Sequence, residues 1–97
     1  MLRIPVTVHG LTRENKHHTE EAETVVVSRL GALLRSRTAW KTGTNVDVTN
    51  SFTKLGDRFR VVWVSDQPKQ GYFDIGIELL TQREDFWGVS FPAAQRA

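Results

Sequence analysis

Short runs in which apolar and polar residues alternate constrain this sequence more than any other feature. Near the start, one side of such a run is formed by Leu2, Ile4, Val6 and Val8. Residues 58–63 and 72–79 alternate in the same way on the two sides of a loop at 66–71, which contains a proline and a glycine. Successive side chains of a strand point to opposite faces, so each run predicts a strand with one buried face. The two later runs predict an antiparallel hairpin.

This hairpin is expected to supply much of the core. Its predicted inward residues are Phe59, Val61, Trp63, Phe73, Ile75, Ile77 and Leu79. The pattern therefore places Trp63 in the core and leaves Arg58 and Arg60 on the outer face. The other two tryptophans, Trp40 and Trp87, come at predicted turns, so we expect them to be open enough to stack on a base.

The other elements are shorter. Residues 25–27 end a second strand, residues 32–37 alternate again, and a turn at 42–44 precedes a strand around 46–48. Pro5 cannot donate a hydrogen bond to a neighbouring strand, so it predicts that the first strand lies at an edge or a seam of the sheet.

The strands are expected to form a single all-β domain, residues 1–97. A chain of 97 residues is long enough for one core. Five or six short strands with turns between them predict a small antiparallel barrel or a sandwich. A barrel is favoured because closure removes exposed strand edges in a chain too short for two full sheets.

Two further segments carry local signals. Residues 10–18 are polar and predict a turn region. Residues 81–84 match a helix capping box just before Phe86 and Trp87, and Gly88 follows closely. We expect a single helical turn near the C-terminus that packs one of these two rings against the mouth of the barrel.

Composition excludes several classes of protein. The chain has no cysteine, which excludes disulfides, thiolate metal sites and a cysteine nucleophile. No apolar run approaches the roughly 18 residues that cross a bilayer, and the first residues lack the apolar segment of a signal peptide. We therefore expect a cytoplasmic protein that does not bind membranes. The net charge of +2 gives only a weak attraction to anions.

The junction at residues 28–31 is the first candidate for an anion or nucleotide site. Ser28 and Gly31 lie three positions apart, with Arg29 between them, and Arg35 and Arg37 share a face further along. Glycine allows a sharp corner, a serine hydroxyl can hydrogen-bond, and arginine offers a planar fork to phosphate or guanine. Serine and glycine are also common turn formers, so a structural turn remains an open alternative.

Catalysis and metal binding have little support in the sequence. His17 and His18 are adjacent, so on a strand they point to opposite faces, and His9 lies elsewhere; we expect no metal site. No histidine is spaced from Ser28 as a catalytic base would be, so we expect a non-catalytic protein without a cofactor. The acidic residues at 20–23 predict a solvated strand or loop.

The order and spacing of five segments resemble the PilZ domain family. These segments are residues 3–6, residues 27–34, the turn at Gly43, residues 60–64 and residues 71–80. The resemblance covers nearly the whole chain. It implies a six-stranded antiparallel β-barrel and a non-catalytic receptor for the bacterial second messenger cyclic di-GMP.

The ligand motifs of that family are present in part. One motif is a pair of arginines four positions apart just before the first strand, and Arg3 matches its second member. The other is an acidic or amide residue followed by a serine and a glycine; Ser28 and Gly31 match it, with Arg29 between them, but Val26 replaces the polar residue. The first arginine would fall before the start of the sequence. Recognition of two phosphates and two guanines needs several such partners, so we expect weak or lost binding.

The resemblance therefore predicts a regulatory or binding module in cyclic di-GMP signalling, with Arg3, Ser28, Arg29 and Gly31 as its ligand-binding residues. The alternative is a small basic β-barrel that binds nucleic acid or a protein partner. Of these partners, nucleic acid is the less favoured.

Overall fold

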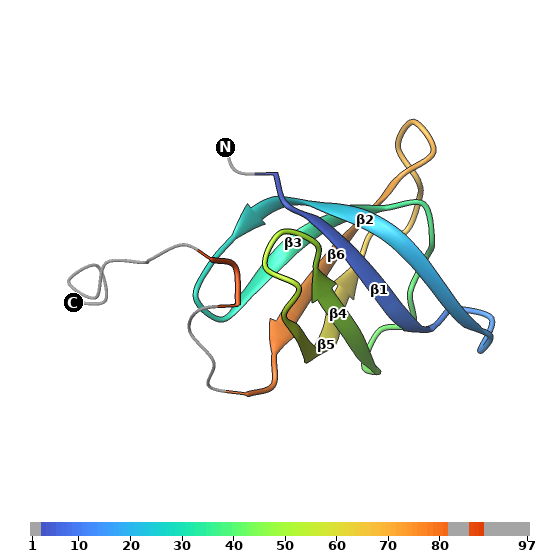
Figure 1. Cartoon of the computed structure of the whole chain (residues 1–97). Coiled ribbons are helices and arrows are strands. Elements are labelled where there is room, and N and C mark those ends of the chain that lie inside the picture. Colours follow the sequence, from blue (N-terminus) through green and yellow to red (C-terminus); the bar gives the residue numbers. More distant parts are fainter. Residues whose placement is uncertain (1–2, 82–85, 89–97) are drawn as a thin grey trace, which may run out of the picture.

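The computed structural model of the chain describes residues 3–81 and 86–88, and six strands form a closed antiparallel barrel (Figure 1). The strands are β1 (Pro5–Leu11), β2 (His17–Val27), β3 (Gly31–Ser36), β4 (Asn45–Asn50), β5 (Gly56–Val64) and β6 (Phe73–Leu79). Around the barrel their order is β1, β2, β3, β6, β5, β4, and β4 closes the ring by pairing with β1. The expected six-stranded antiparallel barrel is confirmed.

The core follows the alternation of the sequence along most strands. The buried apolar residues of the strands and of the segment before β1 are Ile4, Val6, Val8, Leu34, Val46, Val48, Phe59, Val61, Val64, Ile75, Ile77 and Leu79. Period-two alternation was therefore a correct guide on β1, β4 and β6. Phe73 is only partly buried and packs against the edge of this core.

The prediction that Trp63 lies in the core is wrong. Val61 of β5 pairs with Ile77, but the next residue of β6, Gly76, pairs with Trp63, so Val62 is an extra residue in the strand. Such a bulge shifts the alternation by one position. Trp63 consequently points outward and is 50% exposed, and Val64 takes the inward position.

The expectation that Trp40 and Trp87 are open is also wrong, because both rings are buried. The Trp40 indole Nε1 donates a hydrogen bond to the Ser36 hydroxyl at 3.1 Å, which satisfies its one polar atom inside the protein. Trp87 contacts Phe59, with ring centroids 5.8 Å apart. Phe86 also packs on Phe59, at 5.0 Å, so the barrel core takes in both of these aromatic residues.

The strands near the first turn are longer than predicted. β1 continues to Leu11 and β2 begins at His17, so the polar turn is shorter than residues 10–18. Pro5 is the first residue of β1 and precedes the pairing with β4, which begins at Val6. The closed sheet therefore accepts this proline at the beginning of a strand.

The predicted helical turn falls largely on residues 82–85, which lie outside the described residues. The part of the chain that the structure describes contains no helix, and hence none long and apolar enough to cross a membrane.

Candidate functional site

The corner between β2 and β3 is tight and closes on itself. The backbone N–H of Ser28 donates a hydrogen bond to the carbonyl oxygen of Gly31 at 2.9 Å. The Ser28 hydroxyl donates to the same oxygen at 3.4 Å. The side chain of Ser28 is exposed. The hydroxyl therefore has a weak partner inside the corner and can exchange it for a ligand atom by rotating.

Gly31 is required by the close approach of β6. A Cβ atom at this position would lie 2.2 Å from the carbonyl oxygen of Ile77, which is backbone and cannot turn aside. Leu79 then donates its N–H to the carbonyl of Leu30 at 2.6 Å, which holds β6 against the corner. Gly31 thus has a structural role whatever the corner binds.

The corner opens onto a shallow groove of about 400 Å³ on the outer face of the barrel. Gly31 and Gly76 line it without side chains, and the apolar residues Val26, Leu30, Leu33 and Val62 line it with theirs. The groove thus joins the β2–β3 corner to residues of β5 and β6. The partly exposed backbone at Gly76, between apolar walls, is suited to a flat ring or to an apolar side chain.

Val26 faces this groove because β2 carries a bulge. Thr24 pairs with Leu34 and Val26 pairs with Leu33, so Val25 is an extra residue. The shift turns Val26 outward, where it is 54% exposed. A polar residue at this position would therefore reach the groove without being buried.

Sequence reasoning missed the contribution of β5 and β6 to the site. Trp63 pairs with Gly76, and a Cβ on Gly76 would meet the Trp63 Cβ at 3.5 Å and Val62 Cγ2 at 3.6 Å. The half-exposed indole therefore begins directly beside the groove. The glycine on the outer side of an otherwise regular strand was the one available signal.

The arginines of the predicted site are not among the residues that line the groove. Arg3 comes just before β1, whose Pro5 pairs with Glu23 near the end of β2. The Arg3 guanidinium makes an ion pair with the Glu23 carboxylate at 3.1 Å, and both side chains are exposed. Arg29 is partly buried within the corner itself. The structure therefore brings Ser28, Gly31 and Val26 together and leaves Arg3 at the neighbouring ion pair.

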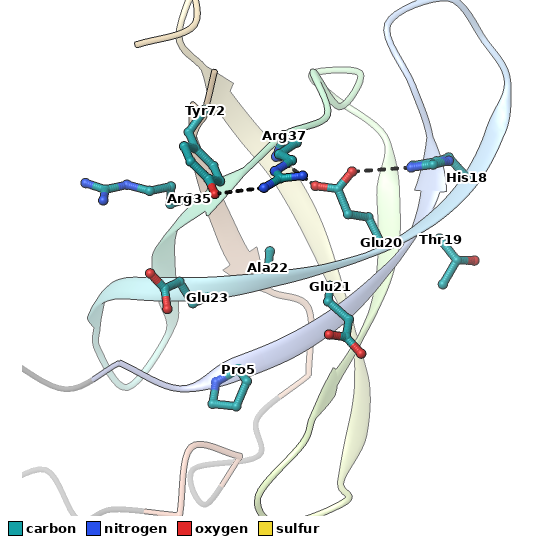
Figure 2. A pocket seen from close by; sticks show the side chains of 10 residues that line it. All are labelled: Pro5, His18, Thr19, Glu20, Glu21, Ala22, Glu23, Arg35, Arg37 and Tyr72. Carbon is teal, nitrogen blue, oxygen red and sulfur yellow. Dashed lines mark hydrogen bonds and ion pairs between the residues drawn. The ribbon is translucent and has the colours of Figure 1, made fainter. Parts of the chain in front are cut away.

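A second hollow lies over β2 and β3 (Figure 2). The Glu20 carboxylate accepts hydrogen bonds there from the Ser36 hydroxyl at 2.9 Å and the Arg37 backbone N–H at 2.7 Å. The Thr38 hydroxyl also donates to it, and His18 Nε2 lies 3.3 Å away. The expectation of a solvated acidic run is wrong for Glu20, whose carboxylate ties β2 to the connection between β3 and β4.

These contacts change the acidity of Glu20. Burial alone raises the pKa of the carboxyl, but the hydrogen bonds from its four neighbours outweigh burial and hold the pKa below its ordinary value. A carboxyl whose pKa is lowered by folding stabilises the protein above its unfolded pKa. That stabilisation is lost as the pH falls through the folded pKa.

Replacing Glu20 by glutamine should lower the free energy of unfolding at neutral pH by about 1–2 kcal/mol, because the hydrogen bonds that the charged carboxylate accepts are weakened. The difference from the parent protein should begin to shrink as the pH falls below the ordinary pKa of glutamate and should disappear below the lowered pKa of folded Glu20. Urea denaturation at several pH values measures both. Glu21→Gln, at the exposed neighbour on β2, is the control and should change little. Equal losses at neutral and acidic pH would contradict this role of the carboxylate.

The remaining arginines lie in separate places. Arg35 and Arg37 line the same hollow, which confirms that they share a face. Arg37 donates to the Tyr72 hydroxyl at 3.4 Å, and its guanidinium carbon is 5.5 Å from the centre of the Tyr72 ring. Arg58 is on β5, where it pairs with Asp47 at 3.4 Å. These side chains therefore do not form one basic patch.

The histidines make local contacts on the surface. His9 stacks on His17 with ring centroids 6.0 Å apart, and His9 Nδ1 is 2.6 Å from the Thr19 hydroxyl. His18 is 5.9 Å from the ring of Trp40. Among residues 3–81 and 86–88, no three histidine, aspartate or glutamate side chains gather closely enough to hold a metal ion.

Comparisons of this chain with protein-family models, curated proteins and solved structures find no match. The fold is therefore assigned by its architecture, a closed six-stranded antiparallel β-barrel.

Proposed function

We propose that this protein is a non-catalytic regulatory module of the PilZ type that binds cyclic di-GMP weakly. The observation that carries the proposal is the groove beside the β2–β3 corner. Ser28, Gly31 and Val26, which occupy the three positions of the second ligand motif, all line it. A receptor for this messenger would act in the bacterial cytoplasm, where a signalling dinucleotide meets its regulators.

The groove suits a guanine base. With no side chain on Gly76, a flat ring can approach the backbone of β6 closely. The half-exposed indole of Trp63 lies beside Gly76 and offers a face for stacking, which contributes about 1–3 kcal/mol per base in other nucleotide sites. The Ser28 hydroxyl adds a hydrogen bond to phosphate or to a base edge.

Arg3 and Arg29 would serve the phosphates. Arg3 must exchange its ion pair with Glu23 for a phosphate, and an ion pair between exposed side chains contributes only about 0–1 kcal/mol. The bidentate fork of arginine then gains a phosphodiester group, which carries one negative charge and offers two acceptor oxygens in matching geometry. Breaking the exposed ion pair therefore costs little, and the proposal requires Arg3 to turn from Glu23 toward the ligand.

Val26 limits the affinity. It presents two methyl groups to the groove where an acidic or amide side chain could accept from the guanine N–H groups. A guanine edge that loses water without gaining a partner costs about 1–3 kcal/mol. We therefore assign a dissociation constant well above about one micromolar.

Calorimetric titration with cyclic di-GMP at physiological salt tests this function. We expect saturable binding at about 10–500 µM, weakened several-fold by Trp63→Ala. Phe52→Ala is the matched control, because this ring is exposed on the β4–β5 loop, away from the groove. A submicromolar affinity abolished by Arg3→Ala would replace the weak site by a complete receptor, and no binding at millimolar ligand would remove the function.

Nucleic-acid binding is less well supported by the same structure. Both tryptophans that the sequence predicted to be open enough to stack on a base, Trp40 and Trp87, are buried. Arg35 and Arg58 lie in different hollows and give no continuous basic track along the described surface. A cyclic dinucleotide therefore fits the site better than a single strand.

A further inference from the structure

The outer face of the β3–β6 pair carries two complementary cross-strand pairs. Arg35 of β3 is in register with Asp74 of β6, and Leu33 is in register with Gly76. Arg35 and Leu33 point to the outside of the barrel, because the residue between them, Leu34, is buried in the core. The Arg35–Asp74 pair combines opposite charges, and the Leu33–Gly76 pair sets a large side chain beside a residue that has no side chain.

The charges of Arg35 and Asp74 are not used within the barrel. None of the ion pairs formed among residues 3–81 and 86–88 includes either residue. Both are only partly buried. Figure 2 shows the guanidinium of Arg35 directed away from Glu20 and Arg37. Among the described residues, Arg35 thus lies in register with Glu23 and Asp74 without a close ion pair to either, and its charge and that of Asp74 can meet opposite charges on a second copy.

A second copy of the chain can be related to the first by a two-fold axis that lies just outside this face, midway between β3 and β6 and parallel to them. Rotation about this axis places the face against the same face of the second copy. Such an axis exchanges β3 and β6 between two copies. Each Leu33 then lies over Gly76 of the partner subunit, and each Arg35 lies over Asp74 of the partner subunit. An isologous interface requires a surface that is complementary to its own rotated image. Both outward pairs meet this requirement, one in shape and one in charge.

The flanking strands support the same arrangement. The axis also exchanges β2 and β5, which lie on the two sides of the β3–β6 pair. Val26 of β2 is 54% exposed and Val62 of β5 is 47% exposed, and both line the groove. Each would meet the other across the axis. Exposed apolar side chains around a charged pair remove water from it on association.

We propose that this face is a homodimer interface, in which Leu33 of each copy inserts into the groove beside Gly76 of the other and Arg35 pairs with Asp74. A second copy fits better than an unrelated protein, because both pairs complement their own two-fold image. The apolar part is narrow, so the dimer belongs to the small, transient class of interfaces. The proposal does not depend on cyclic di-GMP binding, although ligand and partner copy would compete for one groove.

Charge reversal tests the interface. Sedimentation equilibrium of the whole chain from about 10 µM to about 1 mM should show a monomer–dimer equilibrium. Arg35→Asp and Asp74→Arg should each weaken dimerisation at least about tenfold, because each places like charges at both symmetric contacts. An equimolar mixture of the two variants should restore dimerisation, since both contacts of the heterodimer then join opposite charges.

The mixture separates the interface from the fold. Within one chain, Arg35→Asp places two acidic residues in register, and mixing cannot repair that. Lys16→Asp, an exposed change in the β1–β2 turn, is the control and should leave dimerisation unchanged. Leu33→Asp supplies a second variant and should give a monomer. A parent chain that stays monomeric at 1 mM, a mixture no tighter than its components, or a dimer that survives Leu33→Asp would each overturn the proposal.

Discussion

Replacing Gly31 by alanine should destabilise the barrel by about 3 kcal/mol and lower its melting temperature by roughly 10–20 °C. The new methyl group would lie 2.2 Å from the Ile77 carbonyl oxygen, a separation that real atoms do not tolerate. The oxygen belongs to β6, which is hydrogen-bonded on both sides in the closed sheet. Relief therefore requires β3 and β6 to separate at the corner, with loss of ladder hydrogen bonds.

Gly76→Ala is the matched control on the paired strand. Its nearest neighbours would be the Trp63 Cβ at 3.5 Å and Val62 Cγ2 at 3.6 Å, which are ordinary contacts. We expect a change within about 0.5 kcal/mol, because the methyl group only enters the groove. Urea denaturation of both variants decides the matter. Equal stabilities would mean that the approach of β6 to the corner is looser than the structure shows.

The barrel could be predicted because its strands keep period two over most of their length. β1, with Val6 and Val8 inside, and β6, with Ile75 and Ile77 inside, follow the alternation without interruption. The chain is too short to cover two sheets, so closure was the remaining way to protect the strand edges. Alternation within a strand and the length of the chain can both be taken from the sequence without knowing which strands pair.

The outward position of Trp63 could not be predicted in this way. It depends on Val62 being the extra residue opposite Gly76, and a bulge is a property of two strands that pair, not of one. Residues 61–64 are all apolar, so the sequence pattern is the same whether Trp63 or its neighbours point into the core. Trp63, which the sequence pattern placed in the core, is therefore a half-exposed ring beside the groove.

The buried tryptophans were missed for a different reason. Trp40 and Trp87 lie outside the strands, where no periodicity reports on burial. Trp40 donates to the Ser36 hydroxyl four residues earlier and lies beside the His18 ring of β2, and Trp87 contacts Phe59 of β5. Turn residues with large rings are placed by tertiary contacts, which local patterns do not encode.

Only part of the candidate site could be predicted from the sequence. Ser28 and Gly31 stood out because a short motif determines a corner by itself. The groove residues Val62 and Gly76, and the Trp63 ring beside them, come from strands that reach the corner only when the barrel closes. The resemblance to the PilZ family also implied that Arg3 belongs to the site, but the structure shows its guanidinium paired with Glu23.

A gain of affinity is the sharpest consequence of the groove. Val26→Asp, combined with an amino-terminal extension that places an arginine four positions before Arg3, should strengthen cyclic di-GMP binding at least about tenfold. Val26 is 54% exposed and lines the groove, so an aspartate there stays hydrated in the free protein and gains a partner when guanine arrives. The added arginine provides a second fork for phosphate.

Two matched variants show whether the position matters rather than the charge. Val62→Asp puts the same carboxylate on the opposite wall of the groove, at similar exposure, and should weaken binding of an anionic ligand. An extension with alanine in place of arginine separates the added charge from the added length. Calorimetry on folded proteins compares all of them. If Val26→Asp with the arginine extension binds no better than the parent chain, the corner is not a cyclic dinucleotide site, and its apolar groove is left to a protein partner.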